Sequence, residues 1–567
     1  MKRIILAACL IISLTGCDKF LHTESYTNKN TANFPQNKSD LEAMITSVYA
    51  TQISVDGPNV TKNHPYFYGE AASDDRFGGG GAGSLDIQAL DKLMVSHSNQ
   101  FSPIWNVRYQ GIYRANHLLE AIDRCKDVKE EDKNVFIGEA YFFRALFYWE
   151  LAQTFETVPL VLKTEPENLP RASVDELYAQ IASDFINSIK LLPNIPYNQY
   201  QTGRITKWVA EGYLARVFLF YTGFYNKASL PTLDGSLSKT QVVDYLADCI
   251  DNSGHGLLDK FGNLWTYSNE WTKPNYKYAQ DLDLVWAGDD NKEVMHSYRY
   301  SKLGATNSSQ RNLFSAWNGL SVGKLKKEAT FPYGQAWAFG SICQSTWDYW
   351  EANNSTDVRK LGSIIDLDNE LKLKATEKST DGFKGWEETL YRAKKHLPIT
   401  TLDAKKKATF CFSVNAWGVP NANVKSYINN FTLMRFAEIL LMQSELTEDA
   451  KYMNLVRARA GMPAVSYSLQ NIQDERRWEL SFEGFRWNDI RRWHIAENVL
   501  DNQIGETVYN MYKKSTIPTI ANGYVARYKK TKGFWMIPQT EIDLSNGVLT
   551  QNPGWEETDN YIYTGWK

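Results

Sequence analysis

The sequence predicts a mainly α-helical chain in which paired helices stack as in a helical-repeat protein. Five segments before residue 226 carry apolar side chains at intervals of three and four positions, which is the spacing of one helix face. Short polar joints separate these segments, and helices joined in this way commonly stack in pairs. The same periodicity returns after residue 431, whereas residues 255–430 lack it.

The first three predicted helices occupy residues 39–55, 100–123 and 136–155. Ser39 is expected to cap the first helix, because its hydroxyl can accept from a free backbone N–H of the first turn. The third segment is apolar nearly all round, which is typical of a helix buried between others.

A capping box predicts where the fourth helix, residues 173–193, begins. Ser173 and Glu176 have the required spacing, so that each side chain can satisfy the other residue's backbone N–H. Residues 206–225 follow as the partner helix. Three of its residues loosely resemble the first helix of a tetratricopeptide repeat: Trp208, Gly212 and Tyr213.

Helical periodicity fades between residues 255 and 430, where Gly, Asn, Ser and Trp become frequent and residues 293–300 look strand-like. Long loops of this kind are usually functional or disordered, and the many aromatic residues argue against disorder. We therefore expect a loop-rich binding region here. Helices return at 431–446, 450–460 and 470–497.

The chain begins with a short basic segment and an apolar run, Ile4 to Leu14, that is too short to span a bilayer. The run ends in small residues before Cys17, which is the pattern of a bacterial lipoprotein signal. Cleavage before Cys17 would allow acyl chains on its thiol and its new amine, and two or more chains give stable anchoring. The alternatives are an ordinary secretory signal with a chance cysteine, or a short anchor helix.

Composition indicates a globular protein and excludes several classes of function. Charged residues are 22% and hydrophobic residues 43% of the chain. The net charge of −3 gives no support for nucleic-acid binding. The four cysteines after Cys17 are far apart and the eight histidines are scattered, so we expect buried thiols or one disulfide, no metal site and no other cofactor.

Two short motifs of enzymes occur without the context that they need. Residues 319–323 match G-x-S-x-G, but no buried strand precedes the serine. Residues 78–83 match G-x-G-x-x-G, but a polar run stands where a strand should be. We therefore predict no catalytic residues.

The candidate ligand site combines tryptophans in polar, Gly- and Asn-rich surroundings with hydrogen-bonding side chains. An exposed indole offers a flat apolar face on which a pyranose ring can stack. The predicted platforms are Trp265, Trp271, Trp286, Tyr300, Trp317 and Trp337, of which Trp286, Trp317 and Trp337 rank highest. Asp74, Asp75 and Arg76 would bind sugar hydroxyls, or would otherwise form an ion pair at a helix end.

Residues 472–493 hold the densest group of ionisable side chains. Helical spacing predicts pairs between Arg476 and Glu479 and between Glu483 and Arg486. Because aromatic residues are interleaved with these charges, we interpret the group as a structural ion-pair network and not as an active site.

Four segments resemble the SusD/RagB family of outer-membrane nutrient-binding lipoproteins. They are "GEAYFFRALFYWELAQTFETVPLV" (138–161), "RFAEILLMQSEL" (435–446), "ERRWELSFEGFRWNDIRRW" (475–493) and "GFWMIPQTEIDLSNGVLTQNPGW" (533–555). "CDKFL" after the leader also fits this family. The segments occur in the family's order and extend over nearly the whole chain.

The resemblance implies a scaffold of tetratricopeptide-like units with a large loop-rich region that carries the ligand site. It implies a lipid-anchored protein of the outer membrane, a binding protein and not an enzyme, that captures oligosaccharides and delivers them to a SusC-like TonB-dependent transporter. The alternatives are a peptide- or glycopeptide-binding protein of the same transporter type, or a surface glycoside hydrolase.

The expected organisation has four parts. Residues 1–16 form the signal peptide, 17–254 the N-terminal helical region, 255–430 the ligand-binding region and 431–567 the C-terminal helical region and tail.

Overall fold

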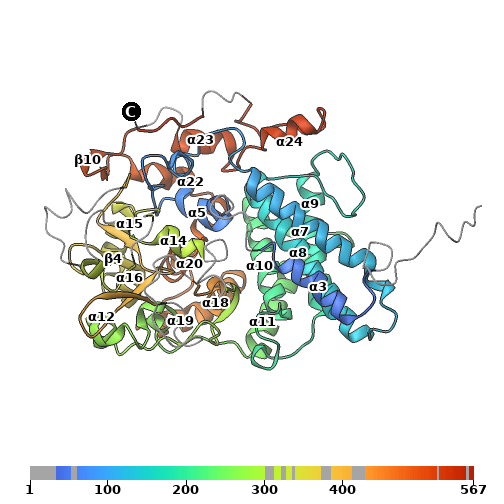
Figure 1. Cartoon of the computed structure of the whole chain (residues 1–567), viewed down its shortest axis with the longest axis horizontal. Coiled ribbons are helices and arrows are strands. Elements are labelled where there is room, and N and C mark those ends of the chain that lie inside the picture. Colours follow the sequence, from blue (N-terminus) through green and yellow to red (C-terminus); the bar gives the residue numbers. More distant parts are fainter. Residues whose placement is uncertain are drawn as a thin grey trace, which may run out of the picture.

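Helices form most of the regular structure of the chain, as the sequence predicted (Figure 1). The structure is a computed structural model and describes residues 34–52, 61–300, 312–320, 327–334, 337, 339–371, 385–411, 428–519, 523–556 and 561–566. Cys17 and the signal peptide lie outside these residues, and so do Ser321 to Gly323 of the G-x-S-x-G match.

A body of paired helices, drawn in blue to green, lies on the right of Figure 1. Successive helices of this body pack against one another, and α8 contacts α3, α7, α9 and α10. Most side chains of α8 are buried, as expected for its uniformly apolar sequence. The helices are α3 (Lys38–Tyr49), α7 (Ser102–Ala121), α8 (Glu130–Phe155), α9 (Val174–Leu191), α10 (Lys207–Phe224) and α11 (Lys239–Asn252).

Two predicted helix caps have different outcomes. The capping box of Ser173 and Glu176 at the start of α9 is confirmed. The prediction of Ser39 as the cap of α3 is wrong, because the helix begins one residue earlier and Asn37 accepts the hydrogen bond from the backbone N–H of Asp40. Asparagine and serine are about equally good caps, so the sequence alone does not separate these two starting points.

The rest of the chain contains shorter helices on the left and at the top of Figure 1. They are α5 (Pro65–Ala72), α6 (Leu85–Gln88), α12 (Lys277–Asp281), α14 (Leu313–Asn318), α15 (Gln344–Asn354), α16 (Val358–Ser363), α18 (Phe436–Thr447), α19 (Ala450–Arg459), α20 (Leu469–Glu479), α21 (Arg486–Arg492), α22 (Ala496–Val499), α23 (Tyr524–Thr531) and α24 (Gln539–Leu544).

The strands among the described residues form antiparallel pairs. The pairs are β1 (Ser229–Thr232) with β2 (Gly235–Ser238), β3 (Val294–Tyr298) with β8 (Phe431–Arg435), β4 (Ile364–Asp366) with β5 (Tyr391–Ala393), β6 (Ile399–Leu402) with β7 (Ala408–Cys411), and β9 (Thr507–Asn510) with β10 (Lys513–Thr516).

The strand-like segment 293–300 is confirmed as β3, but the predicted helix 431–446 is wrong in its first five residues. These residues form β8, which pairs with β3, and the helix begins only at Phe436. The partner strand comes from far away in the sequence, so tertiary pairing overrides the local helical pattern.

The predicted continuous helix 470–497 is also wrong, because the chain turns between α20 and α21. Phe482 and Gly484 both have positive φ in this turn. The predicted Arg476–Glu479 and Glu483–Arg486 pairs are absent from the ion pairs of the described residues, because each of these arginines binds a carboxylate of another segment. Arg476 pairs with Asp489 at 2.9 Å, and Arg486 pairs with Asp74 at 2.7 Å.

The structural ion-pair network itself is confirmed. Glu479 is fully buried and contacts the guanidinium groups of Arg359, Arg435 and Arg459. Glu483 binds Arg435 at 2.7 Å, so the network joins α20 to the end of β8 and to α19. These charges are satisfied by one another inside the protein and are not presented to solvent.

The largest hydrophobic core is continuous from the helical body through α5 to α14. It includes Phe67, Trp317 and Phe339, which lie beneath the candidate site described next. The division of the chain at residues 254 and 430 stays a prediction.

Candidate ligand-binding site

Two of the tryptophans ranked highest from the sequence lie against each other. The ring centroids of Trp317 and Trp337 are 4.6 Å apart and the rings are tilted by 53°. Trp337 is 38% exposed, whereas Trp317 is 8% exposed and packs edge-on against Phe67. Trp337 is thus the solvent-facing member of an aromatic cluster whose other members belong to the core.

Backbone hydrogen bonds hold the two indoles together. Trp317 lies in α14, which Asn312 caps by accepting from the N–H of Ser315. The N–H of Phe339 donates to the carbonyl of Trp317 at 2.8 Å, and the N–H of Trp337 donates to the carbonyl of Ala316 at 3.3 Å. The relative position of the rings therefore depends on main-chain pairing as well as on side-chain packing.

The buried side chain of Arg76 binds the two segments that carry Trp317 and Trp337. Its guanidinium donates to Oδ1 of Asn318 at 2.8 Å, to the carbonyl of Phe339 at 3.0 Å and to the carbonyl of Gly340 at 2.8 Å. It also lies 4.9 Å from the centroid of the Phe339 ring, and it is only 1% exposed. Arg76 therefore positions the aromatic pair and does not itself face a ligand.

Asp74 and Asp75 are also buried and already bound within the protein. Asp74 forms two hydrogen bonds with Arg486, at 2.7 and 2.8 Å, and a third with Arg477. Asp75 accepts from Arg477 and from the hydroxyl of Thr346. Burial alone would raise the pKa of Asp74, but Arg486 and Arg477 outweigh it and hold the pKa at about 2. These contacts of Asp74 and Asp75 fit the alternative given in the sequence analysis, which was an ion pair at a helix end.

Polar groups near the aromatic pair come from residues that the sequence reasoning missed. Nζ of Lys62 lies 5.0 Å from the centroid of Trp317 and 2.6 Å from a carboxylate oxygen of Asp86. Both side chains are partly exposed, so they can still donate to or accept from a ligand beside the aromatic pair. No local motif marks either residue, because the pair forms only when α6 folds against the segment before α5.

Trp265 and Trp286 do not join the pair. They are 4% and 6% exposed and line a separate cavity of about 30 Å³ together with His396 and Asn430. A space of this size corresponds to about one water molecule and is too small for a sugar ring.

The remaining two predicted platforms lie in different surroundings. Trp271 is 42% exposed and sits in the turn after Asn269, whose side chain accepts from its N–H at 2.9 Å. Tyr300 is half-buried, packs against the main core and donates its backbone N–H to Asn430. The structure therefore brings Trp317 and Trp337 together with the support of Arg76, and places the other four platforms elsewhere.

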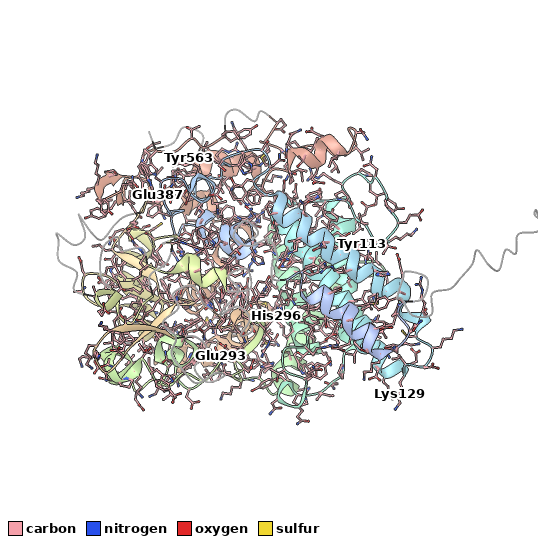
Figure 2. All side chains as sticks on the ribbon, in the orientation of Figure 1. Tyr113, Lys129, Glu293, His296, Glu387 and Tyr563 are labelled. Atoms are coloured by element: carbon pink, nitrogen blue, oxygen red, sulfur yellow. The ribbon has the colours of Figure 1, made fainter. Side chains whose placement is uncertain are left out.

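A polar cleft of about 300 Å³ lies between the joint that precedes α10 and strand β3, near His296 in Figure 2. Its charged side chains are already paired: Arg204 with Glu139 and Glu42, and Arg299 with Asp290. Because these groups are neutralised within the protein, we favour the exposed indole of Trp337 as the centre of the ligand site.

Within the described part of the chain, no group of three His, Cys, Asp or Glu residues could hold a metal ion. Cys125, Cys249 and Cys343 are buried free thiols. Within the same residues, no helix has both the length and the apolar character required to cross a bilayer.

Comparisons with known proteins agree with the fold. A family described as "Starch-binding associating with outer membrane" matches residues 19–219, and the "SusD family" matches residues 414–555. A SusD-like protein of Formosa agariphila is 23% identical over 541 residues, which cover 88% of this chain and 92% of that protein. A SusD-like protein of Bacteroides ovatus is 24% identical over 72% of this chain and 67% of its own length.

Solved structures similar to this chain include a laminarin-binding SusD-like protein, with 22% identity and a TM-score of 0.64 over 92% of this chain and all of that one. Surface glycan-binding protein A from Bacteroides thetaiotaomicron, in complex with laminarihexaose, has 18% identity and a TM-score of 0.67 over 91% of this chain and all of that one. The family matches near both ends and the shared mainly α, tetratricopeptide-like scaffold lead to one conclusion: the chain belongs to the SusD/RagB family.

Proposed function

We propose that this protein is a non-enzymatic, lipid-anchored binding protein that captures glycans at the cell surface through Trp337 and its backing ring Trp317. The observation that carries the proposal is the partly exposed indole of Trp337, which packs against the buried ring of Trp317 and is positioned by main-chain hydrogen bonds. A rigid flat face of this kind binds a pyranose ring with little loss of side-chain freedom.

The ligand class is supported by the relatives. The family is described as starch-binding, and two structural neighbours are named for laminarin or were solved with laminarihexaose. Starch and laminarin oligosaccharides are therefore the first ligands to test. Delivery to a SusC-like TonB-dependent transporter in the outer membrane is the role that the family implies for the captured glycan.

Anchoring through acylated Cys17 completes the proposal. Replacement of Cys17 by alanine is expected to move the protein from the outer-membrane fraction to the soluble fraction, because two or more acyl chains are needed for stable attachment. Recovery of this variant in the membrane fraction would contradict lipid anchoring without affecting the glycan proposal.

The binding test compares Trp337→Ala with Tyr113→Ala by isothermal titration calorimetry. Tyr113 is 51% exposed and lies on α7 of the helical body, as Figure 2 shows, so it is a matched exposed aromatic away from the site. Loss of the Trp337 ring is expected to weaken binding at least about tenfold, or about 1.4 kcal/mol. The Tyr113 variant is expected to bind as the wild type does.

Two results would replace this proposal by one of its alternatives. Binding to a peptide library but to no member of a glycan array would identify a peptide-binding protein of the same transporter type. Release of reducing ends from a polysaccharide by the purified protein would identify a glycoside hydrolase. Equal affinities of the Trp337 variant and the wild type for a bound glycan would exclude the proposed site.

A further inference from the structure

A second pair of tryptophans, Trp386 and Trp566, keeps part of its surface in solvent. Their ring centroids are 6.3 Å apart and the rings are inclined by 31°. Both residues are half-buried. Nε1 of Trp386 has no hydrogen-bond partner among the described residues, so hydrogen bonding does not explain the position of its indole.

Buried charges hold this second pair in place. Nε1 of Trp566 donates to a carboxylate oxygen of Glu387 at 3.1 Å. Glu387 is fully buried and also binds Nζ of Lys92, which lies 6.0 Å from the centroid of the Trp566 ring. The last residues of the chain are thus attached to the segment that carries Trp386.

Main-chain contacts of the tail strengthen this attachment. The N–H of Tyr563 donates to the carbonyl of Val95 at 2.7 Å, and Ile562 forms a parallel bridge with Val95. Figure 2 shows Tyr563 close to Glu387, in agreement with their shared contact with Lys92. The position of Trp566 is therefore set by the fold.

The glycine-rich loop, residues 78–83, lies between the two aromatic pairs. On one side Gly79 forms an antiparallel bridge with Phe339, two residues after Trp337. On the other side the N–H of Trp386 donates to the carbonyl of Gly80 at 2.8 Å. The loop therefore contacts both the segment that follows Trp337 and the segment that carries Trp386.

The exposed part of this loop has almost no side chains. Gly81, Ala82 and Gly83 are all exposed, and a Cβ added to Gly83 would meet no atom within 4 Å. Gly83 is also absent from the glycines with positive φ, so neither packing nor backbone conformation requires glycine there. The exposed part of the loop therefore carries no side chain larger than the methyl group of Ala82.

We infer that Trp386 and Trp566 form a second stacking platform, so that the protein binds an extended oligosaccharide whose chain crosses the glycine-rich loop from Trp337. This inference rests on the proposed function, because it assigns a further part of the same ligand to a further part of the surface. A ligand that contacts both platforms must pass over this loop, which a chain of several linked pyranose rings can do.

The test measures the affinities of the protein for a hexasaccharide and for a disaccharide. Both are taken from the glycan whose binding depends on Trp337. Trp386→Ala is expected to weaken hexasaccharide binding about tenfold and to leave disaccharide binding unchanged, whereas Trp337→Ala weakens both. Trp566→Ala removes the other ring of the pair and is expected to have the same effect. The melting temperature of this variant is also measured, because Trp566 attaches the C-terminal residues to Glu387.

A steric variant tests the path of the chain without removing either platform. Gly83→Leu places a bulky side chain above the loop and is expected to weaken hexasaccharide binding selectively, with Gly83→Ala as its matched control. If the Trp386, Trp566 and Gly83 variants all bind the hexasaccharide like the wild type while Trp337→Ala does not, the second platform is wrong and the proposed function stands. If Trp337→Ala also binds normally, the proposed function fails as well.

Discussion

The guanidinium of Arg76 occupies the space that a side chain at Gly340 would need. A Cβ built on Gly340 would lie 2.7 Å from Nε of Arg76, and Gly340 has a φ of +60°. The carbonyl of the same glycine accepts a hydrogen bond from Arg76 at 2.8 Å. The segment that carries Trp337 is thus fixed to α14 through a contact that only glycine allows.

Replacement of Gly340 by alanine is therefore expected to destabilise the protein and to weaken glycan binding together. The positive φ alone costs a non-glycine residue about 1–3 kcal/mol, and the contact with Arg76 adds to this cost. Chemical denaturation gives the change in the free energy of unfolding. Gly83→Ala is the matched control and should lie within about 0.5 kcal/mol of the wild type, because its Cβ meets no neighbour. Equal stabilities of the two variants would contradict this explanation.

Asp74→Asn should lose stability in a pH-dependent way. The pKa of Asp74 is about 2 in the folded protein, below its ordinary value, because the two arginines outweigh burial. A carboxylate with a lowered pKa stabilises the fold fully above its unfolded pKa and loses this effect as the pH falls toward the folded pKa. The lowered pKa of Asp74 contributes on the order of 2 kcal/mol to the free energy of unfolding at pH 7.

Unfolding free energies of wild type and Asp74→Asn between pH 7 and pH 3 test this expectation, with Glu130→Gln as an exposed control. The gap between wild type and Asp74→Asn should stay constant down to about pH 5 and should narrow below that, as the unfolded chain begins to bind the proton. A gap that stays constant over this range would show that the carboxylate charge of Asp74 does not stabilise the fold.

Local sequence signals predicted much of the scaffold. The capping box at Ser173 needs only residues within one helical turn, and the buried character of α8 is visible in its own sequence. Trp317 and Trp337 could be selected because each indole lies among small or polar neighbours. The pairing of these two indoles is consistent with that selection.

The rest depends on partners distant in the sequence. Arg76 bonds with Asn318, 242 residues away, so its buried positioning role has no local signal. Trp265 and Trp286 also lie among polar residues, yet segments near His396 and Asn430 fold over them. Trp386 becomes noticeable only when the end of the chain brings Trp566 beside it. The sequence shows which residues precede and follow an indole, whereas the exposure of that indole depends on contacts with residues that are distant in the sequence.

Removal of the carboxylate of Glu479 is expected to be strongly destabilising. Three arginines surround this buried group, and Glu479→Gln would remove a carboxylate that all three contact. Each arginine would keep only its other acidic partners, such as Glu475 for Arg359, Glu483 for Arg435 and Glu293 for Arg459. Breaking a buried ion pair from one side typically costs about 3–5 kcal/mol. The control is Glu448→Gln, because Glu448 forms an exposed pair with Lys239 that should contribute little. A loss below about 1 kcal/mol for Glu479→Gln would contradict the role of the network in stability.

Glu211→Gln, unlike Glu479→Gln, is expected to stabilise the protein at neutral and alkaline pH. Glu211 is fully buried in α10, and neither carboxylate oxygen has a hydrogen-bond partner among the described residues. Its nearest cation is Nζ of Lys207 at 3.6 Å. Burial is the largest cause of a rise in the pKa of Glu211 to about 9, so the folded protein holds this group in its neutral form.

The sign of the pH effect follows from this raised pKa. Below pH 4 the group is protonated in both states, but as the pH rises toward 9 only the unfolded chain releases the proton, and the folded state is disfavoured. Glutamine removes this proton release, so the variant should match the wild type near pH 4 and exceed its stability by about 1–3 kcal/mol at pH 8. Glu438→Gln is the contrasting control, because Glu438 is also fully buried but both of its carboxylate oxygens accept hydrogen bonds from Arg216, and its loss should destabilise the fold. A Glu211→Gln variant that is less stable than the wild type at pH 8 would show that the carboxylate is ionised and paired in the folded protein.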